Sequence, residues 1–150
     1  MGRAIPHFIR PSLVARAANR AYGWLASAGL GPRYSYLLRV AGRKTGRIHS
    51  TPVNVLSYNG RLFLVATRGQ TQWSRNALAE GKVSLKKGRV QMEFRARPIP
   101  DAEKPEILKA YLTRFNWMVR RFFSVRADAP VPAFAPTAGR YPVFELVRNP

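Results

Sequence analysis

The sequence of 150 residues has no cysteine, two histidines and only seven acidic residues. The lack of cysteine excludes disulfides, thiolate metal sites and cysteine nucleophiles. The histidines and acids have neither the spacing of a zinc protease nor the context of a Ser-His-Asp triad, so we expect no metal and no covalent catalysis by side chains. Chemistry carried by a bound cofactor is therefore the favoured kind of function.

Long hydrophobic runs are missing as well. No apolar stretch approaches the about 20 residues that cross a bilayer, and residues 1–6 lack the apolar core of a signal peptide. We therefore expect a cytoplasmic protein. The length is typical of one domain. Within that domain, residues 1–34 are predicted to form an N-terminal helical segment and residues 35–150 the main body.

Positive charge is abundant: 26 Lys and Arg against 7 Asp and Glu give a net charge of +19. Such an excess indicates a polyanionic partner, which could be a coenzyme, an anionic lipid surface or a nucleic acid. Nucleic acid is the less favoured of these partners. The arginines are spread over every segment, and the aromatic residues lie mostly in apolar runs instead of an exposed stacking pattern.

Residues 11–28 have the pattern of an amphipathic helix with a basic outer face, and Gly29 and Gly31 follow it. We expect this helix to cover the open end of a barrel. Peripheral contact with the inner face of a membrane is the alternative, because the basic face and Trp24 also suit a lipid interface.

From Ser35 onward the sequence is typical of short strands. The second and third strands are expected to pair across Asn59-Gly60, with the third strand in the centre of the sheet. Short connections between hairpins predict a mainly β fold with flanking helices (α+β), in which an antiparallel sheet curls into a barrel. The predicted strands are residues 36–40, 50–57, 61–67, 82–87, 90–98 and 141–147; the predicted helices are 72–80, ended by Gly81, and 101–123, with an irregular loop over 127–139.

The loop Gly42-Arg43-Lys44-Thr45-Gly46 lies between the first two strands. Its cations, with Arg47 and His49, bracket two glycines, so that charges and exposed backbone N–H groups could converge on phosphate or carboxylate oxygens. A Walker loop is excluded, because the strand-to-helix context is missing. The pentapeptide alone fits an anion site and a charged hairpin tip equally well.

The sequence contains four short blocks: Gly42 to Gly46, Ser50-Thr51-Pro52, residues 65–69 and Trp73-Ser74-Arg75-Asn76. In this order they resemble the deazaflavin-dependent nitroreductase family, over about residues 35–147. The resemblance implies a split antiparallel β-barrel of the flavin-reductase type, related to FMN-binding and pyridoxamine-phosphate-oxidase-like proteins. It also implies the 5-deazaflavin coenzyme F-420, whose phosphate and oligoglutamate tail is a polyanion. FMN or heme in the same barrel is the alternative.

The resemblance assigns residues to the two ends of such a site. In the coenzyme part, Pro52 would lie by the ring system and Asn76 would bond to the tail. His49 stands where better-known members have arginine. The implied coenzyme residues are Arg43, Lys44, Thr45, Gly46, His49, Pro52, Thr67, Arg68, Gly69, Trp73 and Asn76.

For the acceptor part, the candidates are Asn54, Phe115 and Trp117. The apolar lining fits a small hydrophobic acceptor such as a quinone, with nitro compounds as a further class, although aromatic residues at helical spacing also suit a core. The implied reaction is hydride transfer from the reduced coenzyme, with Thr67, Tyr111 or water as the proton donor. Split barrels of this kind are often homodimers, so a homodimer is a further expectation.

Overall fold

The computed structural model describes residues 33–148. The predicted helix over residues 11–28 lies outside this range, so its packing on the barrel or on a membrane stays a prediction. None of the helices in the described range is both long and apolar enough to span a membrane. The elements in chain order are β1 (Ser35–Ala41), β2 (Ile48–Asn54), β3 (Leu56–Tyr58), β4 (Arg61–Val65), α2 (Gln72–Glu80), β5 (Lys82–Lys87), β6 (Val90–Pro98), η1 (Asp101–Glu103), α3 (Lys104–Arg114), α4 (Asn116–Val119), η2 (Arg120–Phe122), η3 (Val131–Arg140) and β7 (Val143–Arg148).

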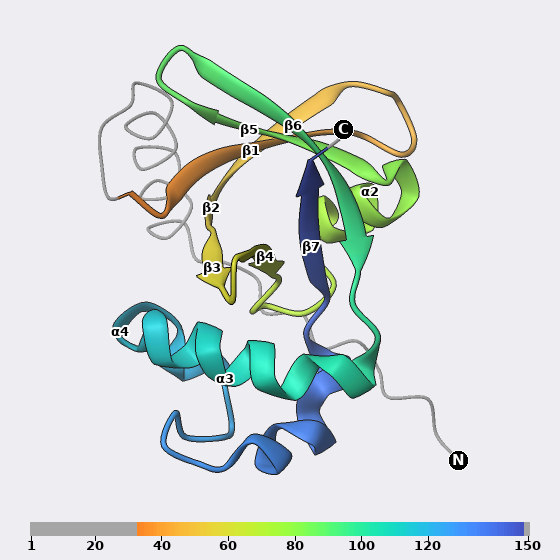
Figure 1. The fold of residues 1–150 in the computed structure, drawn as a ribbon. Helices are drawn as coiled ribbons and strands as arrows, with labels where there is room; N and C mark the ends of the chain where they lie inside the picture. The colour runs from red at the N-terminus through yellow and green to blue at the C-terminus, as the bar shows by residue number, and fades with distance from the viewer. Residues whose placement is uncertain (1–32, 149–150) are drawn as a thin grey trace.

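The strands form one antiparallel sheet in the order β2-β1-β5-β6-β7-β4-β3. Its two edge strands, β2 and β3, are separated in the chain by Val55 alone. Because one residue cannot bridge the width of a flat sheet, the sheet must curl until its edges meet. The predicted split barrel is therefore confirmed, and α3 and α4 lie across its lower end in Figure 1.

The chain from 50 to 57, predicted as one strand, changes partner in its middle. β2 pairs with β1, whereas β3 pairs with β4. The backbone N–H of the buried residue Val55 donates to the carbonyl of Tyr34 at 2.9 Å, which takes it out of both ladders. The expected pairing of the second and third strands thus holds only for β3. The third strand, β4, lies one place from the sheet edge and not at its centre.

Two local signals are confirmed. Asn59 and Gly60 both have positive φ, 50° and 73°, as a two-residue type I′ turn between β3 and β4 requires. Helix α2 has its predicted bounds. Thr71 caps its N-terminus by accepting from the N–H of Ser74, and Gly81 ends it in the left-handed region at φ 71°.

The helix predicted over residues 101–123 is divided into η1, α3, α4 and η2. Its break lies at Phe115, with φ −116° and ψ 24°. The ring of Phe115 contacts Tyr34 and Tyr111, with centroids 5.0 and 4.9 Å apart. Neither Gly nor Pro marks the break in the sequence, which is why helical periodicity alone predicted one helix.

The segment predicted as an irregular loop contains the 3-10 helix η3. Its prolines fit this conformation because their fixed φ lies close to the 3-10 value. η3 packs beneath α3 through the buried residues Phe134 and Ala138. The ammonium of Lys104 donates to the carbonyl of Ala138 at 3.3 Å and pairs with Asp101 at 2.7 Å. The segment is therefore part of the core packing.

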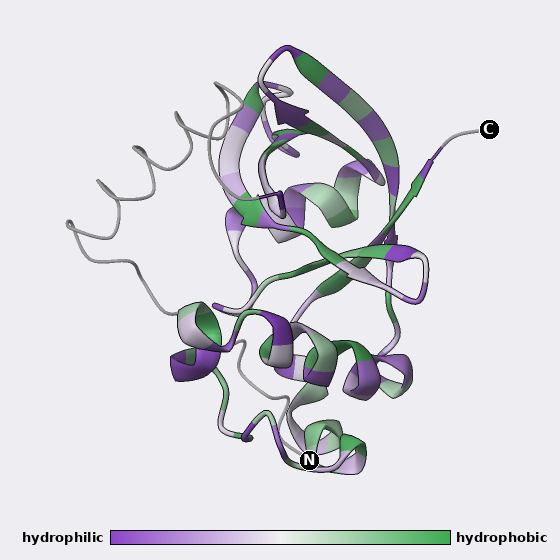
Figure 2. Ribbon diagram, turned by 60° about the vertical axis from the view of Figure 1, so that its left-hand side comes forward, coloured by the Kyte–Doolittle hydropathy of each residue, from purple (hydrophilic) through white to green (hydrophobic). Residues whose placement is uncertain are grey.

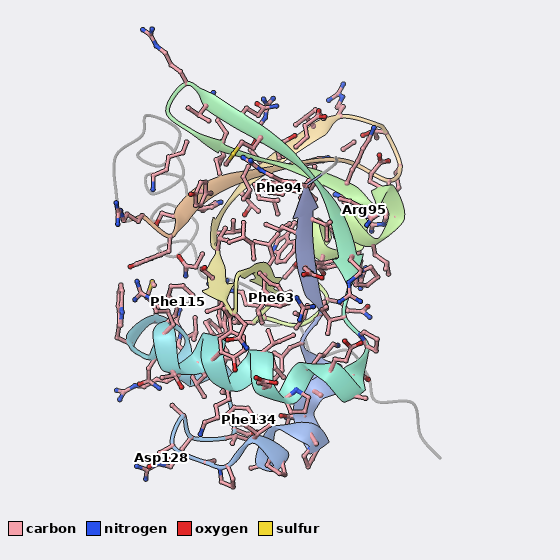
Figure 3. The ribbon with its side chains drawn as sticks, viewed as in Figure 1. Phe63, Phe94, Arg95, Phe115, Asp128 and Phe134 are labelled. Atoms are coloured by element: carbon pink, nitrogen blue, oxygen red, sulfur yellow. The ribbon has the colours of Figure 1, made fainter. Side chains whose placement is uncertain are left out.

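The core has two parts. One fills the barrel and includes Phe94 and Phe144; the other lies between the sheet, α3 and η3. Figure 3 shows Phe63 on the sheet side of α3 and Phe134 on the opposite side. Along β6 hydrophobic and hydrophilic residues alternate, as predicted, and the bands of Figure 2 follow this alternation.

Glu145 of β7 joins three neighbouring strands. Its carboxylate accepts from Arg61 of β4 at 2.6 Å and from Arg97 of β6 at 3.0 Å. The hydrogen bond from Arg61 is the largest cause that lowers the pKa of Glu145 below its ordinary value. Because the native pKa is the lower one, this carboxylate adds stability above the ordinary carboxyl pKa. That contribution is lost as the pH falls through the native pKa.

Glu145→Gln is therefore expected to lower Tm at neutral pH, and the difference from the wild type should vanish in acid. The effect is a few degrees, since the two arginine side chains are 43% and 39% exposed. Thermal melts over a pH series measure it. Glu93→Gln, on the exposed face of β6, is the matched control. A Tm difference that persists unchanged into acid would contradict this account.

Candidate functional site

A cavity of about 1290 Å³ opens beside the β1–β2 hairpin. Small-molecule sites usually measure about 300–1,000 Å³, so this one has room for a large coenzyme and a second molecule. The hairpin and α2 line one end. Strand β2 runs from there over about 20 Å to Asn54, whose amide contacts the sulfur of Met118 in α4 at 3.8 Å. Residues of α3, α4 and η2 line the other end.

Most of the residues that the sequence assigned to a site line this one cavity. Gly46 lies at the hairpin tip with φ 74° and is not among the lining residues. Gly69 lines a smaller cavity next to it. Phe115 is fully buried in the core and lines neither. The predicted residues that do line the large cavity are Arg43, Lys44, Thr45, His49, Pro52, Asn54, Thr67, Arg68, Trp73, Asn76, Tyr111 and Trp117.

The charged side chains that line the cavity are all positive. Among the lining residues in the described part of the chain there is no Asp or Glu. A concave site with several cations and no carboxylate concentrates anions, since nothing inside it neutralises the positive potential. The cationic residues that line it are Arg43, Lys44, Arg47, Arg68 and Arg121.

Arg43 is held in place by α2. Its backbone N–H donates to the Oδ1 of Asn76 at 3.1 Å, and its guanidinium Nη1 donates to the same oxygen at 2.8 Å. The same Nη1 also reaches the Oε1 of Gln72 at 3.0 Å. Asn76 is only 3% exposed, so it is a fixed support. Its Oδ1 thus holds Arg43, and direct contact between Asn76 and a coenzyme tail stays a prediction.

The hairpin itself is rigidly closed. The N–H of Gly42 donates to the carbonyl of Arg47 at 2.7 Å, and the N–H of Gly46 donates back to the carbonyl of Gly42 at 2.8 Å. A Cβ on Gly42 would lie 2.9 Å from the Nε2 of His49, closer than side chains tolerate. Gly42 therefore lets the ring of His49 lie against the loop.

The opposite end of the cavity combines apolar and aromatic side chains with the guanidinium of Arg121 in η2. Trp117 stands at its rim with 71% exposure, whereas Tyr111 is almost fully buried. On α2, across the cavity from these residues, the ring of Trp73 packs against that of Phe144 in β7 with centroids 6.1 Å apart, which fixes one wall of the cavity to the barrel core. Such a surface suits the flat face of an aromatic molecule.

Sequence reasoning missed two lining residues of consequence. Gln72 lies four residues before Asn76 on α2, and this spacing alone could have placed both on one helix face. Arg121 lines the cavity as well, and no motif in the sequence connects it with Arg68. Only the fold brings these two arginines together.

The family model of the F420H(2)-dependent quinone reductases matches residues 15–134. The chain belongs to this family. It is therefore an oxidoreductase, and the resemblance found in the sequence is confirmed. Among curated proteins no sequence matches the chain.

Solved structures similar to this quinone reductase family member share its fold. One is an F420-H2 dependent reductase, with TM-score 0.52, 21% identity, and coverage of 76% of this chain and 94% of that one. Another, described as a domain-swapped dimer, has TM-score 0.56, 18% identity and coverage of 89% and 96%. A FAD-binding protein from Mesorhizobium loti has TM-score 0.51, 11% identity and coverage of 87% and 89%. At these identities the likeness concerns the split barrel alone.

Proposed function

We propose that this chain binds reduced coenzyme F-420 in the large cavity and transfers a hydride from it to a hydrophobic acceptor such as a quinone. One observation carries the proposal. A single cavity joins a cationic end without a carboxylate to an aromatic end about 20 Å away along β2. An elongated molecule with a polyanionic tail and a flat ring matches both ends.

Arg43 and Lys44 would bind the phosphate and glutamate tail at the hairpin, with Thr45 and His49 beside them. Pro52 and Trp73 would lie against the ring. The reduced deazaflavin supplies a hydride when bound. The chain contributes position and charge, because Arg43 is oriented by α2 before any ligand arrives.

At the acceptor end, Asn54 and Trp117 line the space for the acceptor ring. Thr67 and Tyr111 line the same cavity and are the candidate proton donors within it. Phe115 supports this end through the ring of Tyr111 and does not face the acceptor.

Titration of the purified protein with F-420, followed by fluorescence, tests the coenzyme. We expect saturable binding of F-420, and reduction of menadione when the reduced coenzyme is supplied. FMN and heme titrations and a salt series with duplex DNA are run in parallel. Tighter binding of FMN or heme, or binding of DNA without F-420 binding, would overturn the proposal. Nitro compounds extend the acceptor panel, and sedimentation tests the expected homodimer.

Asn76→Ala is expected to raise the Kd for F-420 about tenfold, because Arg43 would lose its fixed support. Gln72→Ala removes the other side-chain acceptor of the same guanidinium, from an exposed position, and should have a smaller effect. Fluorescence titration gives both constants, and a thermal melt confirms that each variant is folded. Unchanged affinity in a folded Asn76→Ala protein would show that Arg43 needs no support.

A further inference from the structure

A second cavity of about 220 Å³ adjoins the acceptor end of the large one. The two share Thr67, Arg121 and Phe122. The small cavity adds the backbone turn at Gly69 and the polar side chains of Ser124 and Arg140. An acceptor lying in the large cavity could therefore extend a substituent into this side cavity.

Arg121, which lines both cavities, and Arg68, which lines only the large one, meet on the ring of Phe122. The guanidinium carbon of Arg121 lies 4.8 Å from the ring centre of Phe122, and that of Arg68 lies 5.3 Å from it. Burial, followed by the positive charge of Arg121, lowers the pKa of Arg68. Two like charges next to one ring repel each other, and an anion bound by both would offset this repulsion.

Within the described residues, no carboxylate forms an ion pair with the arginines around Phe122. The ion pairs found over residues 33–148 engage Arg61, Arg97, Lys104 and Arg126, and none engages Arg68, Arg121 or Arg140. The positive charge is thus available to a ligand. Guanidinium groups beside an aromatic surface suit a carboxylate attached to a flat ring.

The position of this charge separates it from the hairpin. Arg121 belongs to η2, which follows α4 with its apolar residues Trp117 and Met118, whereas Arg43 and Lys44 lie at the other end of β2. Resting on the proposed function, we infer that the physiological acceptor is a flat-ring quinone with an ionised carboxylate on a side chain, bound by Arg121 and Arg140. Phe122 contacts its ring. The carboxylate is unchanged by the reaction: hydride and a proton convert the quinone to the hydroquinone, and the coenzyme is oxidised.

A matched pair of acceptors tests the inference: a naphthoquinone with a propionate side chain, and its methyl ester. The methylene groups insulate the ring, so the two have similar reduction potentials. The wild type should prefer the acid. In Arg121→Gln the KM for the acid is expected to rise about tenfold, the loss of one charge-assisted bond. The KM for the ester should rise much less, so that the ratio of the two KM values falls, and Arg121→Gln with Arg140→Gln should remove the preference.

Arg120→Gln is the control variant, because Arg120 is the neighbouring exposed arginine and lines neither cavity. It removes the same charge and should keep the preference. If both variants lost the preference for the acid to the same extent, the overall charge of the protein would explain it, and the inference would be overturned. If Arg121→Gln weakens F-420 binding and leaves the acid preference intact, the arginines hold the coenzyme phosphate, which also overturns it.

Calorimetry measures how tightly the protein binds each of the two quinones, the propionate and its methyl ester, without any turnover. This measurement separates the inference from the proposed function. Absence of F-420 binding or of turnover with either quinone contradicts the proposed function. The difference in affinity between acid and ester, and its loss in Arg121→Gln, then still decides whether the side cavity is a carboxylate site. Equal affinities in the wild type would rule it out.

Discussion

Removal of both hairpin cations, in Arg43→Gln with Lys44→Gln, is expected to weaken F-420 binding at least about a hundredfold. Each side chain can make charge-assisted hydrogen bonds to phosphate or carboxylate, which are roughly twice as strong as neutral ones. Arg43 has the larger share, because Asn76 and Gln72 already hold it in one orientation and little entropy is lost on binding.

Fluorescence titration at two salt concentrations measures this loss. The wild-type affinity should fall with salt, and the double variant should show a weaker dependence, since fewer ionic contacts remain to be screened. Arg75→Gln is the matched control: it removes an exposed charge from the same helix α2 but does not line the cavity. A loss no greater than that of Arg75→Gln would show that the tail binds elsewhere.

Phe115→Ala is expected to destabilise the protein by about 3–5 kcal/mol, the usual cost of a cavity in place of a buried phenylalanine. Phe115 has 0% exposure and contacts the rings of Tyr34 and Tyr111. Denaturant unfolding measures the loss. Phe115→Leu, which keeps most of the volume, should retain a folded protein with an unchanged KM for menadione.

Trp117→Ala is the complementary variant. Because Trp117 is 71% exposed, its removal should hardly alter stability but should raise the KM for menadione. The pair therefore separates a core aromatic residue from a site aromatic residue two positions along the chain. A raised KM in folded Phe115→Leu, with no change in Trp117→Ala, would reverse the assignment.

The candidate site was predictable from the sequence to the extent that its residues form local blocks. The cationic hairpin, Pro52 and Trp73 lie in short motifs whose order carried the resemblance, and all of these residues line the cavity except the glycine at the hairpin tip. Phe115 and Trp117 could not be told apart in this way, because both belong to the same apolar helical pattern. Periodicity cannot tell which aromatic ring faces the core when the helix changes direction at Phe115 itself.

Interactions within a few residues were determined by the sequence alone. The turn at Asn59-Gly60, the capped ends of α2 and the alternation in β6 depend on φ preferences and neighbouring side chains, which every short segment carries with it. The charge excess and the absence of cysteine likewise limited the chemistry before any fold was known.

Only the tertiary structure decided the contacts between distant segments. The change of partner at Val55 depends on which sheet edges meet. The support of Arg43 by Asn76 joins residues 33 positions apart. Arg68 reaches the ring of Phe122 in η2, where it meets Arg121 of the same 3-10 helix. Such contacts follow from the closure of the barrel and the packing of α3 and η2 beneath it. No local preference encodes them, because their energy comes from burial that exists only in the folded chain.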